Sequence, residues 1–249
     1  MLRYYLSLVF LVLVSSQGLR PFGVQPNTAV AGTWALVQKI ADQSGRANLL
    51  TCVTVTCTLT VPSTGSGHGL LLGSMSSNGS GITISSVSGG CASWQVDAGA
   101  HKSSGAIVDI NAAYCLSSTA SATSIVVTLS SAPTTDVIIY YEVSWSGSSI
   151  SHDTSGATQN AASSTPAGQG LTLGGSGNEA ILQFIGTASG GPTAITSPYD
   201  TNLLTKDNAS STLSFTGGSV AFTSSGSAPT WTLSGSSASL VSAVALKGN

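Results

Sequence analysis

The chain has 249 residues, of which 41% are hydrophobic and only 6% are charged, and its 7 basic and 9 acidic side chains give a formal net charge of −2. The apolar content excludes an intrinsically disordered chain, which would be poor in valine, isoleucine and leucine. The charge argues against a nucleic-acid partner, because phosphate binding needs a clustered basic face. Beyond residue 33 the basic residues are instead scattered singly: Lys39, Arg46, Lys102, Lys206 and Lys247.

The first residues, MLRYYLSLVFLVLVSSQG, place Arg3 before an apolar stretch from Tyr4 to Val14, and small residues follow. This pattern predicts a secretory signal peptide over residues 1–16, because the apolar stretch is shorter than the roughly 20 residues that cross a bilayer. An uncleaved membrane anchor is the alternative. Cleavage before Gln17 would give a mature chain that is secreted or held at the cell surface, with no part in the membrane.

Residues 17–33 contain two prolines and no periodicity, which predicts an extended leader. From Trp34 onward, short β-like runs recur, each closed by glycine, serine, asparagine or proline. The runs cover residues 34–40, 53–61, 69–75, 81–87, 93–98, 106–116, 123–130, 136–145, 170–175, 179–186, 211–215, 218–224 and 239–247.

No segment shows a sustained apolar spacing of three and four residues, which predicts few or no helices. Many short strands separated by turn signals predict an all-β fold, an antiparallel, jelly-roll-like β-sandwich that forms a single domain over residues 34–249. We expect the first and last runs, Trp34–Ile40 and Leu240–Leu246, to lie in the same sheet, which would secure both chain ends.

The stretch TCVTVTCTLTV, residues 51–61, places Cys52 and Cys57 five residues apart in a pattern with a period of two. That period puts Cys57 on the apolar face and Cys52 on the threonine face. In a straight strand the two lie about 16 Å apart, beyond the roughly 4.4–6.8 Å between Cα atoms that a disulfide tolerates, so they pair only if the chain turns between them. Four cysteines in a secreted chain favour disulfides. We prefer Cys52–Cys57 with Cys91–Cys115, and the two crossed connectivities stay open.

The segment DVIIYYEVSW, residues 136–145, is apolar on both faces and predicts a central strand, with Glu142 planted among its apolar side chains. One hypothesis makes Glu142 a ligand-binding or catalytic carboxylate beside an aromatic shelf of Tyr140 and Trp145, the kind of surface on which sugar rings stack. The alternative, which we prefer, makes Glu142 a structural carboxylate that accepts hydrogen bonds from a neighbouring loop.

A glycosidase needs two carboxylates that face each other across a cleft. Glu142 and Glu179 are the only glutamates, and the aspartates mostly sit beside turn residues, where local hydrogen bonding explains them. His152 and Asp153 are adjacent, but neighbours on a strand face opposite ways. No CxxC pair is present and the three histidines are far apart, so we expect no metal and no cofactor. The sequence therefore indicates no catalytic residue, and we expect no enzymatic activity.

Five segments share a recognisable layout: GTWALVQKIADQSG, TLTVPSTGSGHGLLLGSM, ITISSVSGGCASW, TSIVVTLSSAPTTDVIIYYEVSW and APTWTLSGSSASLVSAVALKGN. Together they resemble a loosely defined family of secreted bacterial β-sandwich proteins of jelly-roll type, related to phage and cell-surface domains and of unknown function. The resemblance covers about residues 33–247 and implies the fold without implying an activity. His68 stands where the family pattern has asparagine, and Cys52 is an addition to it.

These observations predict a secreted, non-catalytic protein with a structural, adhesive or carbohydrate-binding role, whose partner is an extracellular glycan or further copies of itself. One alternative is an enzyme that acts on extracellular polysaccharide, which a cleft with two carboxylates within about 10 Å would favour. A second alternative is a subunit of an extracellular filament or particle, in which the leader over residues 17–33 pairs with the sheet edge of a neighbour.

Overall fold

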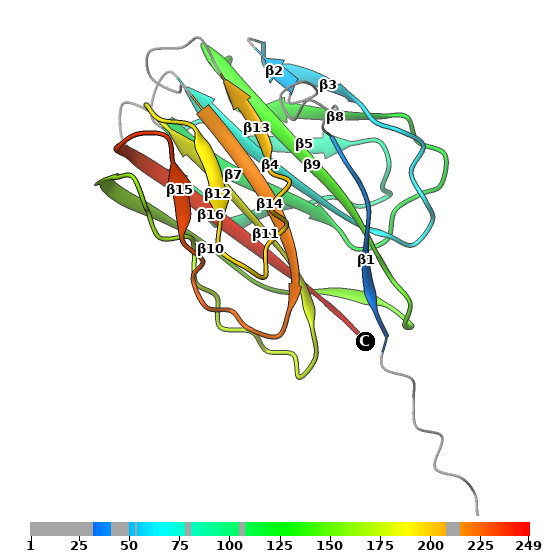
Figure 1. The fold of residues 1–249 in the computed structure, drawn as a ribbon. Helices are drawn as coiled ribbons and strands as arrows, with labels where there is room; N and C mark the ends of the chain where they lie inside the picture. The colour runs from blue at the N-terminus through cyan, green and yellow to red at the C-terminus, as the bar shows by residue number, and fades with distance from the viewer. Residues whose placement is uncertain (1–31, 41–49, 53, 78–80, 105–107, 208–214) are drawn as a thin grey trace, which may run out of the picture. The chain divides into compact units, whose positions relative to one another are not determined.

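Two large antiparallel sheets form the centre of the fold (Figure 1). The first has the strand order β1-β9-β4-β7-β6, and β2 also pairs with β9. Its strands are β1 (Trp34–Lys39), β2 (Leu50–Cys52), β4 (Gly69–Ser77), β6 (Gln95–Ser103), β7 (Val108–Cys115) and β9 (Thr135–Trp145). The second has the order β10-β16-β11-β14-β13. Its strands are β10 (Ile150–Ser163), β11 (Glu179–Thr187), β13 (Leu204–Asp207), β14 (Phe215–Thr223) and β16 (Ser237–Gly248).

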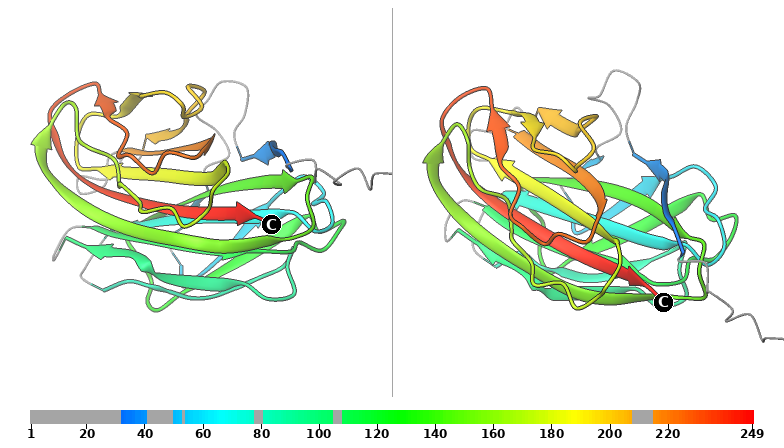
Figure 2. Two further views of the ribbon diagram at one scale, coloured as in Figure 1. Left: turned by 90° about the horizontal axis from the view of Figure 1, so that it is seen from below. Right: turned by 60° about the horizontal axis from the view of Figure 1, so that its bottom comes forward.

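Two small sheets cover the outer faces of the large ones. Strands β3 (Thr56–Thr60), β8 (Ser124–Leu129) and β5 (Ile84–Ser88) pair in that order and pack on the first large sheet. Strands β12 (Pro192–Ile195) and β15 (Trp231–Leu233) pair with each other and pack on the second. Figure 2 shows the two large sheets stacked, with the long strands β10 and β16 side by side and antiparallel.

The structure, a computed structural model, describes residues 32–40, 50–52, 54–77, 81–104, 108–207 and 215–249. Within that part, Gly32–Asn249 group into one unit. The expected signal peptide over residues 1–16 and almost all of the expected leader over 17–33 lie outside the described residues. The described residues form strands, turns and loops only, and none of their segments is a helix able to cross a membrane.

The central strands are apolar on both faces because a layer covers each face. On β9, Ile139 and Tyr141 point into the core between the large sheets, whereas Ile138 and Tyr140 point into the core under β3, β8 and β5. Strand β11 divides its side chains in the same way between the central core and the core under β12 and β15. The period of two therefore distributes one apolar run between two cores, and every residue of β4 and β11 is buried.

The all-β, antiparallel sandwich predicted from the sequence is confirmed, and most of the predicted runs coincide with strands. The run over residues 170–175 is not a strand. Its Leu171 and Leu173 instead pack as loop residues on the outer core. The sequence also failed to predict β10, the longest strand, because ISHDTSGATQNAAS contains no apolar run. Strand β10 lies at the edge of its sheet and pairs with β16 alone, so its side chains are mostly half-buried.

The prediction that the first and last strands share a sheet is wrong. Strand β1 pairs with the end of β9 in the first large sheet, whereas β16 lies between β10 and β11 in the second. Both runs are apolar because both strands face the same central core from opposite sides. An apolar run shows that a strand is buried, but it does not show from which sheet the strand reaches the core.

The segment over residues 51–61 is two strands with a bend, and this changes which side chains are buried. Strand β2 ends at Cys52, a bend covers Thr54 and Val55, and β3 begins in a different sheet. Cys52 is therefore buried instead of lying on an exposed threonine face, and Val55 is 40% exposed. The bend brings the two Cα atoms to 5.8 Å in the disulfide Cys52–Cys57. Cys91 and Cys115 form the second disulfide, so the pairing is the preferred one.

Candidate functional site

Glu142 is fully buried and hydrogen-bond donors surround its carboxylate. Oε1 accepts the backbone N–H of Gly65 at 2.8 Å and lies 2.5 Å from Nδ1 of His68. Oε2 accepts the side-chain amide of Gln38 and the hydroxyl of Tyr140, the latter at 3.3 Å. Burial, reinforced by the charge of Glu142, raises the pKa of Tyr140 and keeps this hydroxyl protonated as a donor. These contacts are those of a structural carboxylate that ties the loop around residue 65 to β9.

The structure does not bring the three predicted ligand-binding residues, Tyr140, Glu142 and Trp145, onto one surface. Tyr140 is fully buried in the core under the three-stranded sheet. Trp145 has the opposite parity on β9 and lies against Trp34 at the edge of the central core, with 5.0 Å between the ring centroids. No aromatic shelf therefore forms beside Glu142.

A pocket lies at the end of β9, and we call it the Trp145 pocket. It has a volume of about 270 Å³ and a mostly polar lining. The end of β9, the loop that precedes β11 and the C-terminal end of β16 form its walls. The lining residues are Trp145, Gly174, Gly175, Ser176, Gly177, Asn178, Glu179, Lys247, Gly248 and Asn249.

Glycines pack closely around the indole of Trp145. A Cβ atom added to Gly32, Gly147 or Gly248 would lie between 2.1 and 2.2 Å from an atom of that indole. Only glycine allows the backbone to approach so closely. The indole is therefore a fixed wall of the pocket and does not offer a free face on which a sugar ring could stack.

The two tryptophans hold the polar rim in place through their N–H groups. Nε1 of Trp34 donates to the carbonyl oxygen of Asn178 at 2.8 Å, and Nε1 of Trp145 donates to the carbonyl oxygen of Asn249 at 3.2 Å. The ring of Phe222 is parallel to that of Trp34, with 6.4 Å between the centroids. An aromatic cluster from both large sheets thus positions the glycine-rich loop and the C-terminal residue.

Two carboxyl groups and one ammonium group meet at the inner end of the pocket. The register of β11 and β16 places Glu179 directly opposite Lys247. Asp153 reaches the same place because β10 has an irregularity between His152 and Thr154, where two steps on β10 match one on β16. A bulge of this kind turns a side chain away from the face that strict alternation assigns to it.

The contacts of the carboxyl groups come mainly from backbone amides. Gly174 N–H donates to Oδ2 of Asp153 at 2.6 Å, and Nζ of Lys247 lies 3.3 Å from Oδ1. Gly175 N–H donates to Oε1 of Glu179 at 3.0 Å. The carboxyl groups of Asp153 and Glu179 also lie near enough for each to affect the pKa of the other.

The surroundings shift the pKa values of the two carboxyl groups in opposite directions. Burial and then the charge of Asp153 raise the pKa of Glu179, against the opposing effect of the Gly175 N–H. Burial would also raise the pKa of Asp153, but the Gly174 N–H and Lys247 hold it below its ordinary value. Oε2 of Glu179 is buried and has no hydrogen-bond partner among the described residues.

The pocket lining differs from a glycosidase site in its carboxyl groups. The two carboxyl groups of a glycosidase face the same sugar and stand about 5–5.5 Å apart in retaining enzymes and about 6.5–9.5 Å apart in inverting ones. Here Glu179 lines the pocket, whereas Asp153 is not among the lining residues and contacts the Gly174 N–H and Lys247. The lining therefore contains one carboxyl group, that of Glu179.

Several aspartates do not sit beside turn residues, where the sequence led us to expect them. Asp97, Asp109, Asp136 and Asp153 lie within strands, and the first three are buried. Asp109 accepts the backbone N–H groups that follow β4, whereas Asp97 accepts Ser155 Oγ at 2.8 Å and lies 3.1 Å from Nε2 of His152. Asp200 and Asp97 make the local contact of the expectation, since they accept the N–H groups of Asn202 and Gly99, each two residues later.

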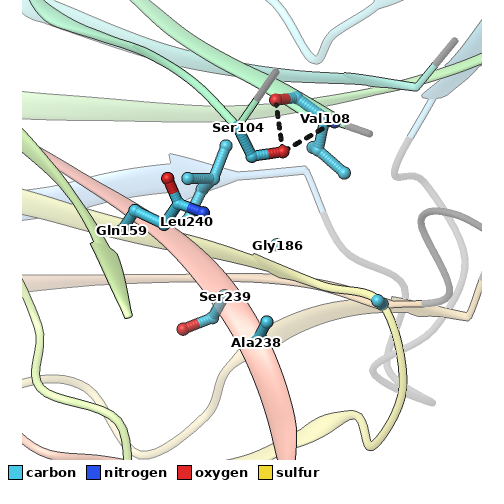
Figure 3. Close-up of a pocket in the computed structure, with 8 residues that line it drawn as sticks. Ser104, Val108, Gln159, Gly186, Ala238, Ser239 and Leu240 are labelled. Carbon is cyan, nitrogen blue, oxygen red and sulfur yellow. Dashed lines mark hydrogen bonds between the residues drawn. The ribbon is translucent and has the colours of Figure 1, made fainter. Parts of the chain in front are cut away.

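A small cavity also opens between the large sheets, where Ser104 and Val108 face Leu240 (Figure 3). Its volume is about 60 Å³, and small or uncharged side chains line it. The hydroxyl of Ser104 bonds to the backbone of Val108, at 3.1 Å from its nitrogen. The cavity has no charged or nucleophilic side chain with a free function, so it is not a candidate active site.

Comparison of the chain with protein-family models, with curated proteins and with solved structures found no match. The functional argument therefore depends on the pocket itself. Sequence reasoning missed Lys247 as a pocket residue and Asp153 as its partner behind the lining, because a bulge and a long-range register bring the two together. The one local signal was the loop GGSGN directly before Glu179, which offers several backbone amides in a row.

Proposed function

We propose that the protein is a secreted, non-catalytic carbohydrate-binding protein of the β-sandwich class, and that the Trp145 pocket holds one sugar unit of an extracellular glycan. The observation that carries this proposal is the polar lining of the pocket. Backbone N–H and C=O groups of a glycine-rich loop, the side chain of Asn178 and the pair Glu179–Lys247 converge on one small space. A ligand with many hydroxyl groups and no net charge matches such a mixture of donors and acceptors.

The size and charge of the pocket favour a small ligand without a net charge. Its volume of about 270 Å³ lies just below the roughly 300–1,000 Å³ of pockets for drug-sized molecules, which suits a single ring better than a long chain. Lys247 pairs with Asp153, and burial, followed by the charge of Asp153, raises the pKa of Glu179. A neutral sugar therefore fits better than a strongly anionic or cationic ligand.

A location outside the cytoplasm is part of the proposal. Two disulfides are typical of oxidising compartments, and the pattern of residues 1–16 predicts export. The resemblance to secreted bacterial sandwich proteins supports the same location. N-terminal sequencing of exported protein should return Gln17 as the first residue, and a chain that still begins at Met1 would remove this part of the proposal.

A glycan array tests the binding, with two glycine variants as a matched pair. Gly177 lines the pocket and a Cβ there meets nothing within 4 Å, so Gly177→Trp should fold and fill the mouth of the pocket. Gly235 lies outside the pocket, and a Cβ there meets only Cα of Gly190 at 3.8 Å. We expect Gly177→Trp to lose binding at least about tenfold and Gly235→Trp to keep it.

Two results would overturn the assignment. One is the absence of any bound glycan on a broad array when the natural chain is folded. The other is unchanged binding by Gly177→Trp, which would place the glycan elsewhere on the surface. A size measurement on the same protein distinguishes a monomeric binding protein from a filament or particle subunit.

A further inference from the structure

The disulfide Cys52–Cys57 lies beside a third group with metal-binding chemistry, far in sequence from both cysteines. Strand β2 pairs with the start of β9 so that Cys52 stands directly opposite Asp136. The two sulfur atoms and a carboxylate oxygen of Asp136 all lie within 4.8 Å of one another, and all three residues are buried. Cross-strand pairing and the bend before β3 create this arrangement.

Asp136 is fixed through one oxygen and free at the other. Its Oδ1 accepts the hydroxyl of Ser74 at 2.9 Å and that of Ser76 at 2.6 Å, both from the adjacent strand β4. Its Oδ2 has no hydrogen-bond partner among the described residues, although the side chain is fully buried. A buried carboxylate oxygen without a partner costs free energy, which a cation beside it would offset.

The donor set is one that zinc prefers. Two thiolates and one carboxylate give an S₂O set, and zinc binds such ligands tetrahedrally with Zn–S distances of about 2.3 Å. At the tetrahedral angle this separates the two sulfurs by about 3.8 Å, a short movement for side chains whose Cα atoms are 5.8 Å apart. The two serine hydroxyls would orient Asp136 as outer-shell hydrogen bonds orient metal ligands elsewhere.

We propose that reduction of the Cys52–Cys57 disulfide creates a zinc site formed by Cys52, Cys57 and Asp136, with water as the fourth ligand. A dithiol reductant supplies the two electrons and two protons that convert the S–S bond to two thiols and is itself oxidised to a cyclic disulfide. A phosphine supplies the two electrons and becomes a phosphine oxide, with the oxygen and the two thiol protons taken from water. The two thiols then release their protons to solvent as zinc binds. The exposed bend at Thr54 and Val55 gives access from solvent.

The zinc would take over the mechanical role of the disulfide. That disulfide links β2 of the first large sheet to β3 of the three-stranded sheet. A metal held by both sulfurs preserves this link in reducing surroundings and adds a bond to β9. The site is independent of the Trp145 pocket, so either proposal stands or fails without the other.

Cobalt is the probe for the experiment, because tetrahedral Co²⁺ bound to thiolates absorbs in the visible and near-ultraviolet. The natural chain is reduced with a phosphine and titrated with Co²⁺ and then with Zn²⁺, while circular dichroism reports folding. We expect one Co²⁺ per chain with thiolate bands, displacement by one Zn²⁺, and a higher melting temperature of the reduced protein with zinc. Unreduced protein should show no such bands.

Three variants assign the ligands. Cys52→Ser/Cys57→Ser should abolish the thiolate bands, whereas Cys91→Ser/Cys115→Ser should keep them. Asp136→Asn should weaken cobalt binding by at least about tenfold. Reduced natural protein without thiolate bands, whether folded or not, would overturn the proposal, as would bands that survive in Cys52→Ser/Cys57→Ser or binding that is unchanged in Asp136→Asn.

Discussion

Glu142 and Glu179 are the two glutamates of the chain, and both are buried in different surroundings. Donors from four residues surround Glu142, and the cluster belongs to the packed interior. Glu179 meets one backbone N–H and a second carboxyl group at the inner end of a polar pocket. We therefore do not distinguish a structural carboxylate from a proposed binding carboxylate by burial alone. We distinguish them by the number of hydrogen-bond donors around the carboxylate and by whether a pocket lies beside it.

Asp136 extends the comparison to a buried carboxylate that accepts two serine hydroxyls, the only side-chain donors it meets in the part of the chain that the structure describes. Burial, opposed by the hydrogen bonds of Ser76 and Ser74, raises the pKa of Asp136 from 3.8 to about 7. Between those two pH values the folded chain keeps a proton that the unfolded chain releases. The free energy of unfolding therefore falls as the pH rises through this window, by about 4 kcal/mol from this group.

Urea denaturation of the oxidised protein at a series of pH values measures this effect. Asp136→Asn removes the titrating group, so the curve of the natural protein should fall more steeply from pH 4 to 7 than that of the variant. Equal slopes for the two proteins would show that Asp136 is ionised in the folded state and would contradict the account.

Glu142→Gln should lower the free energy of unfolding by about 3 kcal/mol. The amide nitrogen of glutamine cannot accept the hydrogen bonds that one carboxylate oxygen now accepts, and it leaves buried donors without a partner. Tyr140→Phe, which removes only the 3.3 Å contact to Oε2, should cost about 1 kcal/mol and serves as the graded control. A loss below 1 kcal/mol for Glu142→Gln would show that the donor cluster is not structural.

Gly147→Ala tests whether the indole of Trp145 is a rigid wall. A Cβ at this position would lie 2.2 Å from Nε1 of that indole, so the ring must move, at an expected cost of about 1–3 kcal/mol. Gly177→Ala leaves open space around the added methyl group and should lower the free energy of unfolding by less than about 0.5 kcal/mol. Thermal melts followed by tryptophan fluorescence measure both, and equal melting temperatures would mean that the wall yields.

Glu179→Gln should have the smallest effect on stability, within about 0.5 kcal/mol of the natural protein at neutral pH. Glutamine has nearly the shape of glutamate, keeps an oxygen that accepts the Gly175 N–H, and removes the repulsion by Asp153 that raises the pKa of Glu179. The same substitution thus gives opposite results at the two glutamates. A loss at Glu179 as large as that at Glu142 would show that Glu179 is ionised and held by donors, which would remove the distinction.

Strand positions were predictable wherever both faces of a strand are covered. The apolar runs of β4, β9 and β11 are visible in the sequence because each supplies two cores. Strand β10 was not predictable, since an edge strand half-buried against one neighbour needs no apolar run. The preferred pairing of Cys52 with Cys57 required a turn between them, because a straight strand would hold them too far apart, and the structure contains that bend.

The candidate site was largely out of reach of sequence reasoning. Glu142 stood out as a charge in an apolar strand, yet its role depends on a loop more than 70 residues away, through Gly65 and His68. Asp153, Glu179 and Lys247 come from three strands whose register and bulge no local pattern reveals. Pairing between strands far apart in the sequence decides which polar side chains contact each other. The period of two in the sequence predicts only on which face of its strand a side chain lies.

The most direct test of the central claim is a nitrogen–proton correlation spectrum of the mature protein during titration with simple neutral sugars: glucose, galactose, mannose and N-acetylglucosamine. The account predicts that at least one of these sugars shifts the amide signals of Gly174–Glu179 and Lys247–Asn249, which line the Trp145 pocket, and leaves those of Gly65 and His68 in place. Shifts that gather around Gly65 and His68 while the pocket amides stay unchanged would contradict it and return Glu142 to the role of a binding residue.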